Sequence, residues 1–150
     1  MKSLIVFDTK HGNTQKVADL IAEGINSVEG NDTKVANVKD IDLNEEQTYD
    51  LIVIGSPNHV GSHIKSIKKF IGNLPSATLK FNSIAVFDTY MGKALGKALK
   101  KMEKQLNEKF PDSTIALPGL SIKVGGMKGP IVDEDLSKCK EYGIKLAKKE

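Results

Sequence analysis

The sequence predicts an α/β fold in which helices cover both faces of a five-stranded parallel sheet. Short apolar runs rich in β-branched residues alternate along the chain with longer amphipathic stretches. This alternation repeats about five times, which is typical of parallel strands joined by crossover helices. The chain contains no internal repeat, linker or low-complexity segment. We therefore expect one domain over residues 1–150.

The N-terminal third contains two expected strands. Ser3–Asp8 is an apolar run, and Thr33–Val38 is the second candidate. Asn13–Glu29 between them is expected to be helical, because its apolar residues recur on one face: Val17, Leu20, Ile21, Ile25 and Val28. The acidic segment Asp40–Gln47 is expected to be a loop or a short helix.

The middle of the chain contains the third and fourth strands. Asp50–Gly55 has four consecutive apolar residues, as expected for a strand that is covered on both faces. Ser83–Asp88 has the same character. The helix expected between them, Gly61–Leu74, has an apolar face made of Ile64, Ile67, Phe70, Ile71 and Leu74, and His63 is expected at the surface.

The C-terminal third begins with what we expect to be the longest helix, Gly92–Phe110. Its apolar stripe consists of Leu95, Leu99, Met102, Leu106 and Phe110, and the lysines expected to face water are Lys93, Lys97, Lys100, Lys101 and Lys104. Leu117–Val124 is the candidate for the fifth strand, and Gly125–Pro130 is a loop. The final helix, Asp133–Lys149, ends in lysines that suit its dipole.

Composition and charge exclude several classes of protein. The net charge of +3, with 5% aromatic residues and no Trp, disfavours a nucleic-acid binder. The single cysteine, Cys139, is expected in the core and excludes both an internal disulfide and a CxxC site. No apolar stretch approaches the roughly 20 residues that span a bilayer. With no signal peptide visible at the start, the expected location is the cytoplasm.

The loops that follow the strands are the candidate site, because open parallel sheets bind ligands at the carboxyl ends of their strands. These loops are Thr9–Thr14, Ser56–Gly61 and Asp88–Gly92. The first of them leads directly into a helix, whose unpaired N–H groups favour anions. Its hydroxyls, amide and glycine therefore predict a phosphate cradle, with simple helix capping as the alternative. Neither GxxxxGK[ST] nor GxGxxG is present.

The run IVFDTKHGNTQKVA, from Ile5 to Ala18, resembles the flavodoxin signature. The seven matching positions are Ile5, Val6, Phe7, Thr9, Gly12, Thr14 and Ala18. The other loops also fall where this family has them, and the resemblance covers essentially the whole chain. It implies a flavodoxin-like doubly wound sheet of strand order 2-1-3-4-5 and FMN as the cofactor. The short path from Leu117 to the last helix resembles the short-chain members.

The resemblance also implies roles for the three loops. The first loop would hold the FMN phosphate, the second would lie along the isoalloxazine ring, with a peptide near Gly61 reaching flavin N5, and the third would stack Tyr90 on the ring. His59 departs from the family, which often has an aromatic residue there. The residues so implied are Thr9, Lys10, His11, Gly12, Asn13, Thr14, Ser56, Pro57, Asn58, His59, Val60, Gly61, Asp88, Thr89, Tyr90, Met91 and Gly92. Whether Lys10 and His11 touch the phosphate stays open.

The expected function is that of an FMN-binding electron carrier without catalytic side chains. Its partners would be redox proteins, either a reductase or ferredoxin-like donor or an acceptor enzyme. We expect no nucleic acid, no membrane and a monomer. Flavodoxins are typically acidic, so the charge of +3 predicts an acidic partner surface and a less negative potential for the fully reduced flavin.

Three alternative functions are compatible with parts of this pattern. A flavodoxin-like FMN oxidoreductase acting on a quinone or porphyrinogen would use the same cradle, although no additional substrate loop is visible in 150 residues. A receiver domain needs a phosphorylatable Asp after the third strand, where this chain has Gly55-Ser56-Pro57. A binding module that has lost its flavin would not need the intact loops.

Overall fold

The computed structural model describes residues 1–112, 114–126 and 128–148. Its sheet is parallel throughout and has the order β2-β1-β3-β4-β5, with β6 also paired to β4. The strands are β1 (Lys2–Phe7), β2 (Asp32–Asn37), β3 (Thr48–Pro57), β4 (Lys80–Tyr90), β5 (Thr114–Ile115) and β6 (Leu120–Lys123). The expected strand order 2-1-3-4-5 is thereby confirmed, with the fifth strand divided into two pieces.

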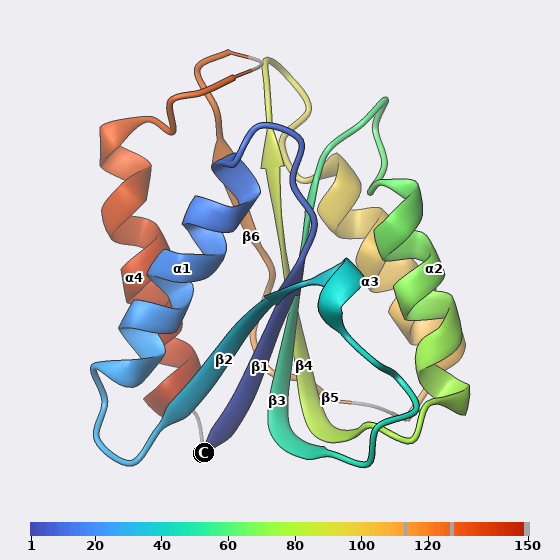
Figure 1. Ribbon diagram of the computed structural model, residues 1–150. Coiled ribbons are helices and arrows are strands. Elements are labelled where there is room, and N and C mark those ends of the chain that lie inside the picture. Colours follow the sequence, from blue (N-terminus) through green and yellow to red (C-terminus); the bar gives the residue numbers. More distant parts are fainter. Residues whose placement is uncertain (113, 127, 149–150) are drawn as a thin grey trace.

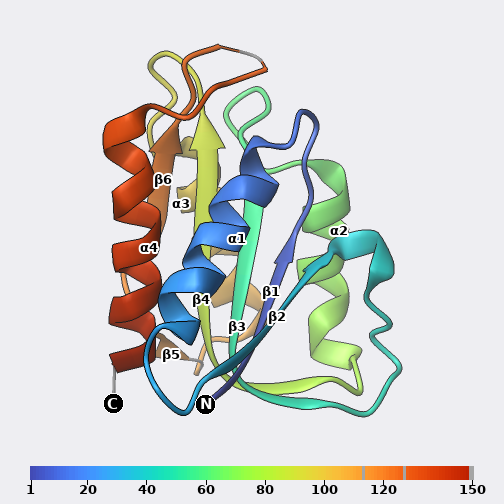
Figure 2. The same ribbon diagram turned by 60° about the vertical axis from the view of Figure 1, so that its left-hand side comes forward.

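Helices cover both faces of this sheet, as expected (Figure 1). The helices are α1 (Asn13–Asn26), α2 (Lys65–Asn73), α3 (Lys97–Lys109) and α4 (Asp133–Lys148), with short 3-10 turns at Val38–Asp40 and Leu74–Ser76. Helices α1 and α4 lie on one face, whereas α2 and α3 lie on the other (Figures 1 and 2). Among the described residues, no helix is long and apolar enough to cross a membrane.

Two hydrophobic cores result, one on each face of the sheet. Side chains alternate between the faces of a strand, so Ile5 and Phe7 of β1 enter the core beneath α1 and α4. Leu4 and Val6 enter the core beneath α2 and α3. Because both faces are covered, the central strands are apolar at consecutive positions, and Leu4, Ile5 and Val6 are all fully buried. This burial fixes the strand ends from which the site loops emerge.

Helices α1 and α4 pack unusually closely because each contributes a glycine to their contact. A Cβ atom added at Gly24 would lie 2.1 Å from the Lys140 carbonyl oxygen. One added at Gly143 would lie 2.1 Å from the Ile21 carbonyl oxygen. Neither glycine leaves room for a side chain, so the backbones meet directly. The close contact holds α1, and with it the loop that precedes α1, firmly against α4.

Several expected boundaries were wrong because glycines adopt conformations that a helix excludes. The helix expected from Gly92 begins at Lys97, since Gly92 and Gly96 have φ of 60° and 69°. It has 13 residues and is shorter than α4, which has 16. Leu95, expected in its apolar stripe, instead lies in the preceding loop and is 63% exposed.

The helix expected from Gly61 begins four residues later, at Lys65. Val60 and Gly61 both have positive φ, of 50° and 75°, and form a tight turn closed by mutual backbone hydrogen bonds between His59 and Ser62. His63, expected at the surface, is buried. Its Nε2 lies 2.7 Å from Oε1 of Gln105 on α3, so the ring ties this loop to α3.

The strand expected over Leu117–Val124 is shorter than predicted, because only β6, Leu120–Lys123, lies within these bounds and β5 comes before them, at Thr114–Ile115. β5 pairs with the start of β4 and β6 with its end, and Ala116–Gly119 lies between them. Gly119 packs against Leu99 so closely that a Cβ would come within 2.3 Å of its side chain. Pro118 cannot donate a ladder hydrogen bond, so the strand breaks there. Lys149, expected to end the last helix, lies outside the described residues.

Candidate functional site

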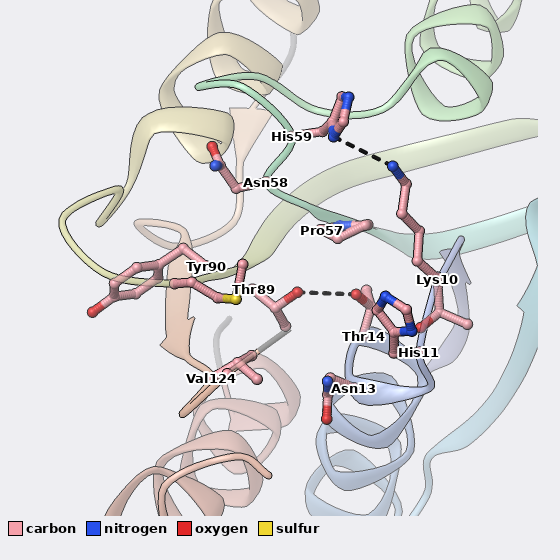
Figure 3. Close-up of a pocket in the computed structure, with 13 residues that line it drawn as sticks. Lys10, His11, Asn13, Thr14, Pro57, Asn58, His59, Thr89, Tyr90 and Val124 are labelled. Atoms are coloured by element: carbon pink, nitrogen blue, oxygen red, sulfur yellow. Dashed lines mark hydrogen bonds between the residues drawn. The ribbon is translucent and has the colours of Figure 1, made fainter. Parts of the chain in front are cut away.

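A cavity of about 310 Å³ opens at the carboxyl ends of β1, β3 and β4 (Figure 3). Its size is at the lower end of the range for pockets that hold small molecules and cofactors. The lining residues come from four loops and are Thr9, Lys10, His11, Asn13, Thr14, Pro57, Asn58, His59, Thr89, Tyr90, Met91, Val124 and Gly126. The structure therefore brings together the three loops that the sequence singled out, as the rule for parallel sheets predicts.

The first loop presents an uncapped helix N-terminus to the cavity. Gly12 stands at the N-cap of α1 with φ of 89°, a left-handed conformation that favours glycine, and no described side chain caps the helix there. The first turn of α1 contains no acidic residue. The Thr9 hydroxyl accepts a hydrogen bond of 2.9 Å from the Gly12 N–H, which shapes the turn. These features leave the positive end of the helix dipole available to an anion.

Thr14 and Asn13 connect this loop to two other parts of the site. The Thr14 hydroxyl lies 3.0 Å from the Thr89 hydroxyl, and both residues are buried (Figure 3). Asn13 packs against Gly129, where a Cβ would come within 2.6 Å of Asn13 Oδ1. The N-terminus of α1 is thus fixed from two sides, by β4 and by the loop that precedes α4.

The second loop, after β3, forms another wall of the cavity. Pro57, Asn58 and His59 line it, and the Asn58 N–H donates a 2.7 Å hydrogen bond to the Thr89 carbonyl. The Oδ1 atom of Asn58 is buried without a hydrogen-bond partner among the described residues. A buried acceptor of this kind is costly unless something donates to it, so it marks a place where a bound molecule would add a bond.

Lys10 bridges the first and second loops at the rim of the cavity. Its Nζ lies 3.3 Å from Nδ1 of His59, and Figure 3 shows the two side chains meeting at the rim. An ammonium group is a donor only, so the imidazole nitrogen facing it must accept. The Lys10 ammonium is therefore directed at the second loop, whereas His11 lines the cavity beside α1.

Tyr90, the last residue of β4, and Met91, the first residue of the loop that follows, both line the cavity. Asp88 lies beneath this loop and is fully buried. One carboxylate oxygen accepts a 2.5 Å hydrogen bond from the Ser121 hydroxyl, and the other accepts a 2.9 Å bond from the Leu99 N–H in the first turn of α3. Burial raises the pKa of Asp88, and these two hydrogen bonds oppose that rise.

Six of the residues implied by the resemblance do not line the cavity: Gly12, Ser56, Val60, Gly61, Asp88 and Gly92. Ser56 and Asp88 are fully buried and use their oxygens to hold backbone. The Ser56 hydroxyl donates to the Pro57 carbonyl and accepts from the Ile64 N–H. The four others occupy turns with positive φ. They shape the loops around the cavity, and a direct contact of any of them with a cofactor stays a prediction.

Val124 and Gly126 are lining residues that the sequence analysis missed. They follow β6, and the Val124 N–H donates a 2.8 Å hydrogen bond to the Tyr90 carbonyl. The rule that selected the first three loops also applies to the last strand of the sheet. The loop after Val124 was not selected by this rule, because the sequence pattern that predicted the fifth strand was weak.

The chemistry of the lining fits a molecule with a phosphate at one end and an apolar ring at the other. The α1 N-terminus, Thr9 and Thr14 supply donors for an anion. Pro57, Met91 and Val124 supply apolar surface, and Tyr90 supplies an aromatic face. Among the described residues, no group of three or more His, Cys, Asp or Glu side chains could hold a metal ion. The residues present therefore fit a flavin mononucleotide.

The chain is similar to known proteins over most of its length. Residues 4–120 match the model of a family described as the flavodoxin domain. A flavodoxin of Clostridium beijerinckii is 30% identical over 95% of this chain and 97% of its own length. A flavodoxin from the domain Archaea has a solved structure with a TM-score of 0.80 and 27% identity, covering 98% of this chain and 96% of that one.

A shorter part of the chain is similar to an enzyme. The protoporphyrinogen IX dehydrogenase [quinone] of Escherichia coli (strain K12) is 30% identical over 57% of this chain, and the match spans half of that enzyme's length. The family match and the Clostridium flavodoxin cover much more of the chain. Together with the strand order 2-1-3-4-5 and the loop-lined cavity, they establish that the chain belongs to the flavodoxin-domain family, and this family implies a flavin cofactor.

Proposed function

We propose that this protein is an FMN-binding electron carrier that passes electrons between redox proteins. The observation that carries the proposal is the uncapped N-terminus of α1, which opens into a cavity whose other walls are apolar and aromatic. An anion-binding end and a ring-binding end in one cavity fit FMN better than they fit a free phosphate or a flavin without phosphate.

The proposed phosphate-binding group consists of the first N–H groups of α1 and the hydroxyls of Thr9 and Thr14. The ring would be held by Tyr90, Met91 and Val124, with Pro57 and Asn58 along its edge. When bound, the flavin supplies the redox chemistry, and the protein contributes binding, exclusion of water and the local electrostatic field. No side chain in this scheme acts as a nucleophile or a general base.

The positive charge at the rim of the cavity should also influence the reduction potential of a bound flavin. The Lys10 ammonium lies at the edge of the cavity and no described carboxylate pairs with it. A nearby cation stabilises any ligand that gains negative charge, so Lys10 favours reduction. We therefore propose a less negative potential for the fully reduced flavin than in flavodoxins whose site is surrounded by carboxylates.

A second candidate function is an FMN-dependent oxidoreductase acting on a quinone or a porphyrinogen. The partial likeness to the Escherichia coli protoporphyrinogen IX dehydrogenase [quinone] favours it. The lining of the cavity comes from short loops, and no additional described segment widens it toward a second substrate. We therefore place the carrier first.

One set of measurements separates the two candidates. The purified protein is loaded with FMN, and its visible spectrum is followed through a redox titration and then in the presence of a soluble quinone and an electron donor. A carrier should reduce in two resolved one-electron steps and turn over the quinone slowly. Rapid, saturable quinone turnover would favour the oxidoreductase. A protein that fails to bind FMN would contradict both candidates.

A further inference from the structure

The exposed apolar side chains of this protein gather beside the cavity. Among the described residues, the large apolar side chains that are exposed are Val60, Met91 and Leu95. All three lie in the loops after β3 and β4, and Val60 is 88% exposed. Single exposed apolar residues are ordinary, but three that come from two adjacent loops form an apolar patch.

Two lysines belong to the same surface. Lys97 lies against the second loop, with its Cδ 3.9 Å from a Cβ built on Gly61. This contact places Val60, which precedes Gly61, near Leu95, which is two residues before Lys97. Lys93 is exposed in the same segment as Leu95. Val60, Met91, Leu95, Lys93 and Lys97 are named the Val60 surface from here on.

The charges of the Val60 surface are not neutralised within the described part of the chain. The ion pairs among the described residues join Lys138 to Asp135 and Lys140 to Glu23. Neither pair involves Lys93 or Lys97. The carboxylates closest in sequence to the site loops are already engaged in hydrogen bonds. Asp8 accepts hydrogen bonds from the Ser66 hydroxyl and the Thr9 N–H, and Asp88 is held by Ser121 and Leu99. This surface therefore presents cations and apolar groups to solvent.

Exposed acidic residues do occur at this end of the molecule, but on the opposite side of the sheet. Asp133 and Glu134 in the first turn of α4 are exposed, whereas Asp135 beside them is half-buried and paired with Lys138. Figure 1 shows α4 and α3 on opposite sides of the sheet, with the site loops between them. The Val60 surface and the first turn of α4 thus carry opposite charge on the two sides of the sheet. Such an arrangement orients an approaching charged protein as well as attracting it.

The backbone at Val60 shows that its position has a conformational cost. A β-branched residue with φ of 50° is strained, and the following Gly61 already supplies the flexibility that the turn needs. Strain at an exposed apolar side chain gives the free protein no compensating burial. Local strain that persists without a packing reason is a feature of binding and functional sites.

We propose that the Val60 surface is the docking site for an acidic redox protein, an inference that rests on the proposed electron-carrier function. The partner's carboxylates would face Lys93 and Lys97, and an apolar group at the centre of its surface would cover Val60 and Leu95. Docking there would bring the partner's redox centre to the rim of the cavity, where the transfer distance is short. Charge complementarity favours an acidic protein over a second copy of this basic chain.

The test uses binding and electron transfer separately. The ¹⁵N-labelled protein, without flavin and again with FMN, is titrated at low salt with a purified acidic [2Fe–2S] ferredoxin, and with a basic c-type cytochrome for comparison. The FMN-loaded, reduced protein is then mixed with the oxidised ferredoxin in a stopped-flow instrument at several salt concentrations. Lys93→Glu/Lys97→Glu reverses the charge of the surface, and Leu95→Gln removes apolar area from it. Lys104→Glu/Lys145→Glu is the control with the same change in net charge elsewhere.

We expect ferredoxin to shift the amide signals of residues 59–62 and 91–97 in both forms, and the transfer rate to fall with rising salt. Lys93→Glu/Lys97→Glu should lower that rate at least about tenfold at low salt and flatten its salt dependence. Leu95→Gln should lower it by about three- to tenfold at all salt concentrations. The control should change it less than about twofold, because Lys145 lies on the opposite side of the sheet and Lys104 lies seven residues farther along α3 than Lys97, so neither would face the docked partner.

Three outcomes would overturn the docking surface. Signal shifts centred on α4 or on the far end of α3 would place the partner elsewhere. A control variant that loses as much rate as the surface variant would show a response to net charge alone. Self-association through these residues in sedimentation, or binding of the protein to anionic phosphatidylserine vesicles through them, would assign the surface to another occupant. FMN binding by every variant is measured by quenching of flavin fluorescence. A failure to bind FMN would contradict the proposed function. The ferredoxin titration of the flavin-free protein would then still test the docking surface.

Discussion

The hydroxyl of Thr14 on α1 lies 3.0 Å from the hydroxyl of Thr89 on β4, and both side chains are buried at the base of the cavity. The bond joins the helix that would bind the phosphate to the strand whose next residue, Tyr90, lines the cavity where the ring would lie. Each hydroxyl has one proton and two acceptor positions, so the pair keeps bonding capacity for a ligand.

Thr14→Ala should therefore weaken FMN binding about tenfold or more and riboflavin binding much less, because riboflavin lacks the phosphate. Thr14→Ser keeps the hydroxyl and should retain most of the affinity. Flavin fluorescence titrations of both ligands measure this. Equal losses for FMN and riboflavin would mean that Thr14 acts only through its bond to Thr89. In that case Thr89→Val should reproduce the loss.

Gly24→Ala should destabilise the protein by about 1–3 kcal/mol, although alanine is the better helix former. The added Cβ would lie 2.1 Å from the Lys140 carbonyl oxygen, and backbone cannot turn aside as a flexible side chain can. Gly72→Ala is the matched control in α2, because its Cβ would meet only Gln105 Nε2, at 3.8 Å. That control should stabilise by about 0.5–1 kcal/mol. Urea unfolding measures the free energy of unfolding of the two variants. A change in the same direction for both variants would contradict the close α1–α4 contact.

Asp88→Ala should cost about 2–4 kcal/mol of folding free energy, because the Leu99 N–H and the Ser121 hydroxyl would both lose a buried acceptor. Asp88→Asn keeps an acceptor for one of them and should cost about 1 kcal/mol or less. Thermal unfolding gives the comparison. Backbone amide exchange should further show that Asp88→Ala loosens residues 91–99, since this carboxylate holds the first turn of α3. Unchanged exchange in that segment would contradict the positioning role.

His63 should make the protein sensitive to mild acid. Burial lowers the pKa of its imidazole below the usual 6.5, the bond to Gln105 opposes this, and Lys68 and Lys101 lower it further. As pH falls below 6.5, the unfolded chain takes up a proton that the folded chain still refuses. The free energy of unfolding therefore decreases from pH 6.5 downward, until the folded imidazole is itself protonated. His63→Gln should reduce this slope and leave the difference between the two proteins constant from pH 7 to 8. Urea unfolding at several pH values measures both, and identical slopes below pH 6.5 would contradict the prediction.

Val60→Asn should stabilise the protein by about 1 kcal/mol, because asparagine tolerates the left-handed conformation that valine resists. The same variant should transfer electrons to an acidic ferredoxin more slowly, since its polar side chain no longer offers apolar surface. Stability and docking would then change in opposite directions. A Val60→Asn protein that is less stable than the parent would show that the turn is not strained.

The sequence was sufficient to predict the sheet because its signals are local. Consecutive apolar residues at Leu4–Val6 and Leu51–Ile54 indicate strands buried on both faces, and the structure confirms them. The order of the strands came from the resemblance to a family. Helix starts were less predictable, because the positive φ of Gly61, Gly92 and Gly96 depends on how each loop turns and not on a periodic pattern.

Long-range partners explain the remaining errors. His63 resembled a surface histidine because Gln105, its hydrogen-bond partner, is 42 residues away in the sequence. Asp88 does not line the cavity, because its bonds to Ser121 and Leu99 hold it beneath the loop, and its expected contact with the cofactor stays a prediction. Gly126 was missed because the strand before it is short and interrupted. Composition and spacing therefore located the site, whereas tertiary contacts decided which residues face it.

The lone thiol of Cys139 can serve as an intrinsic reporter of partial opening of the native protein. It is fully buried on α4, its hydrogen bond of 3.2 Å goes to the Asp135 carbonyl, and burial together with Asp135 raises its pKa to about 12. A thiol reagent can reach it only when α4 moves away from the core that it shares with α1 and the sheet. The first turn of α1 is also the proposed phosphate-binding turn. Comparing the labelling rates of Cys139 with and without flavin would therefore show whether a ligand bound at one end of α1 suppresses opening along the whole α1–α4 pair.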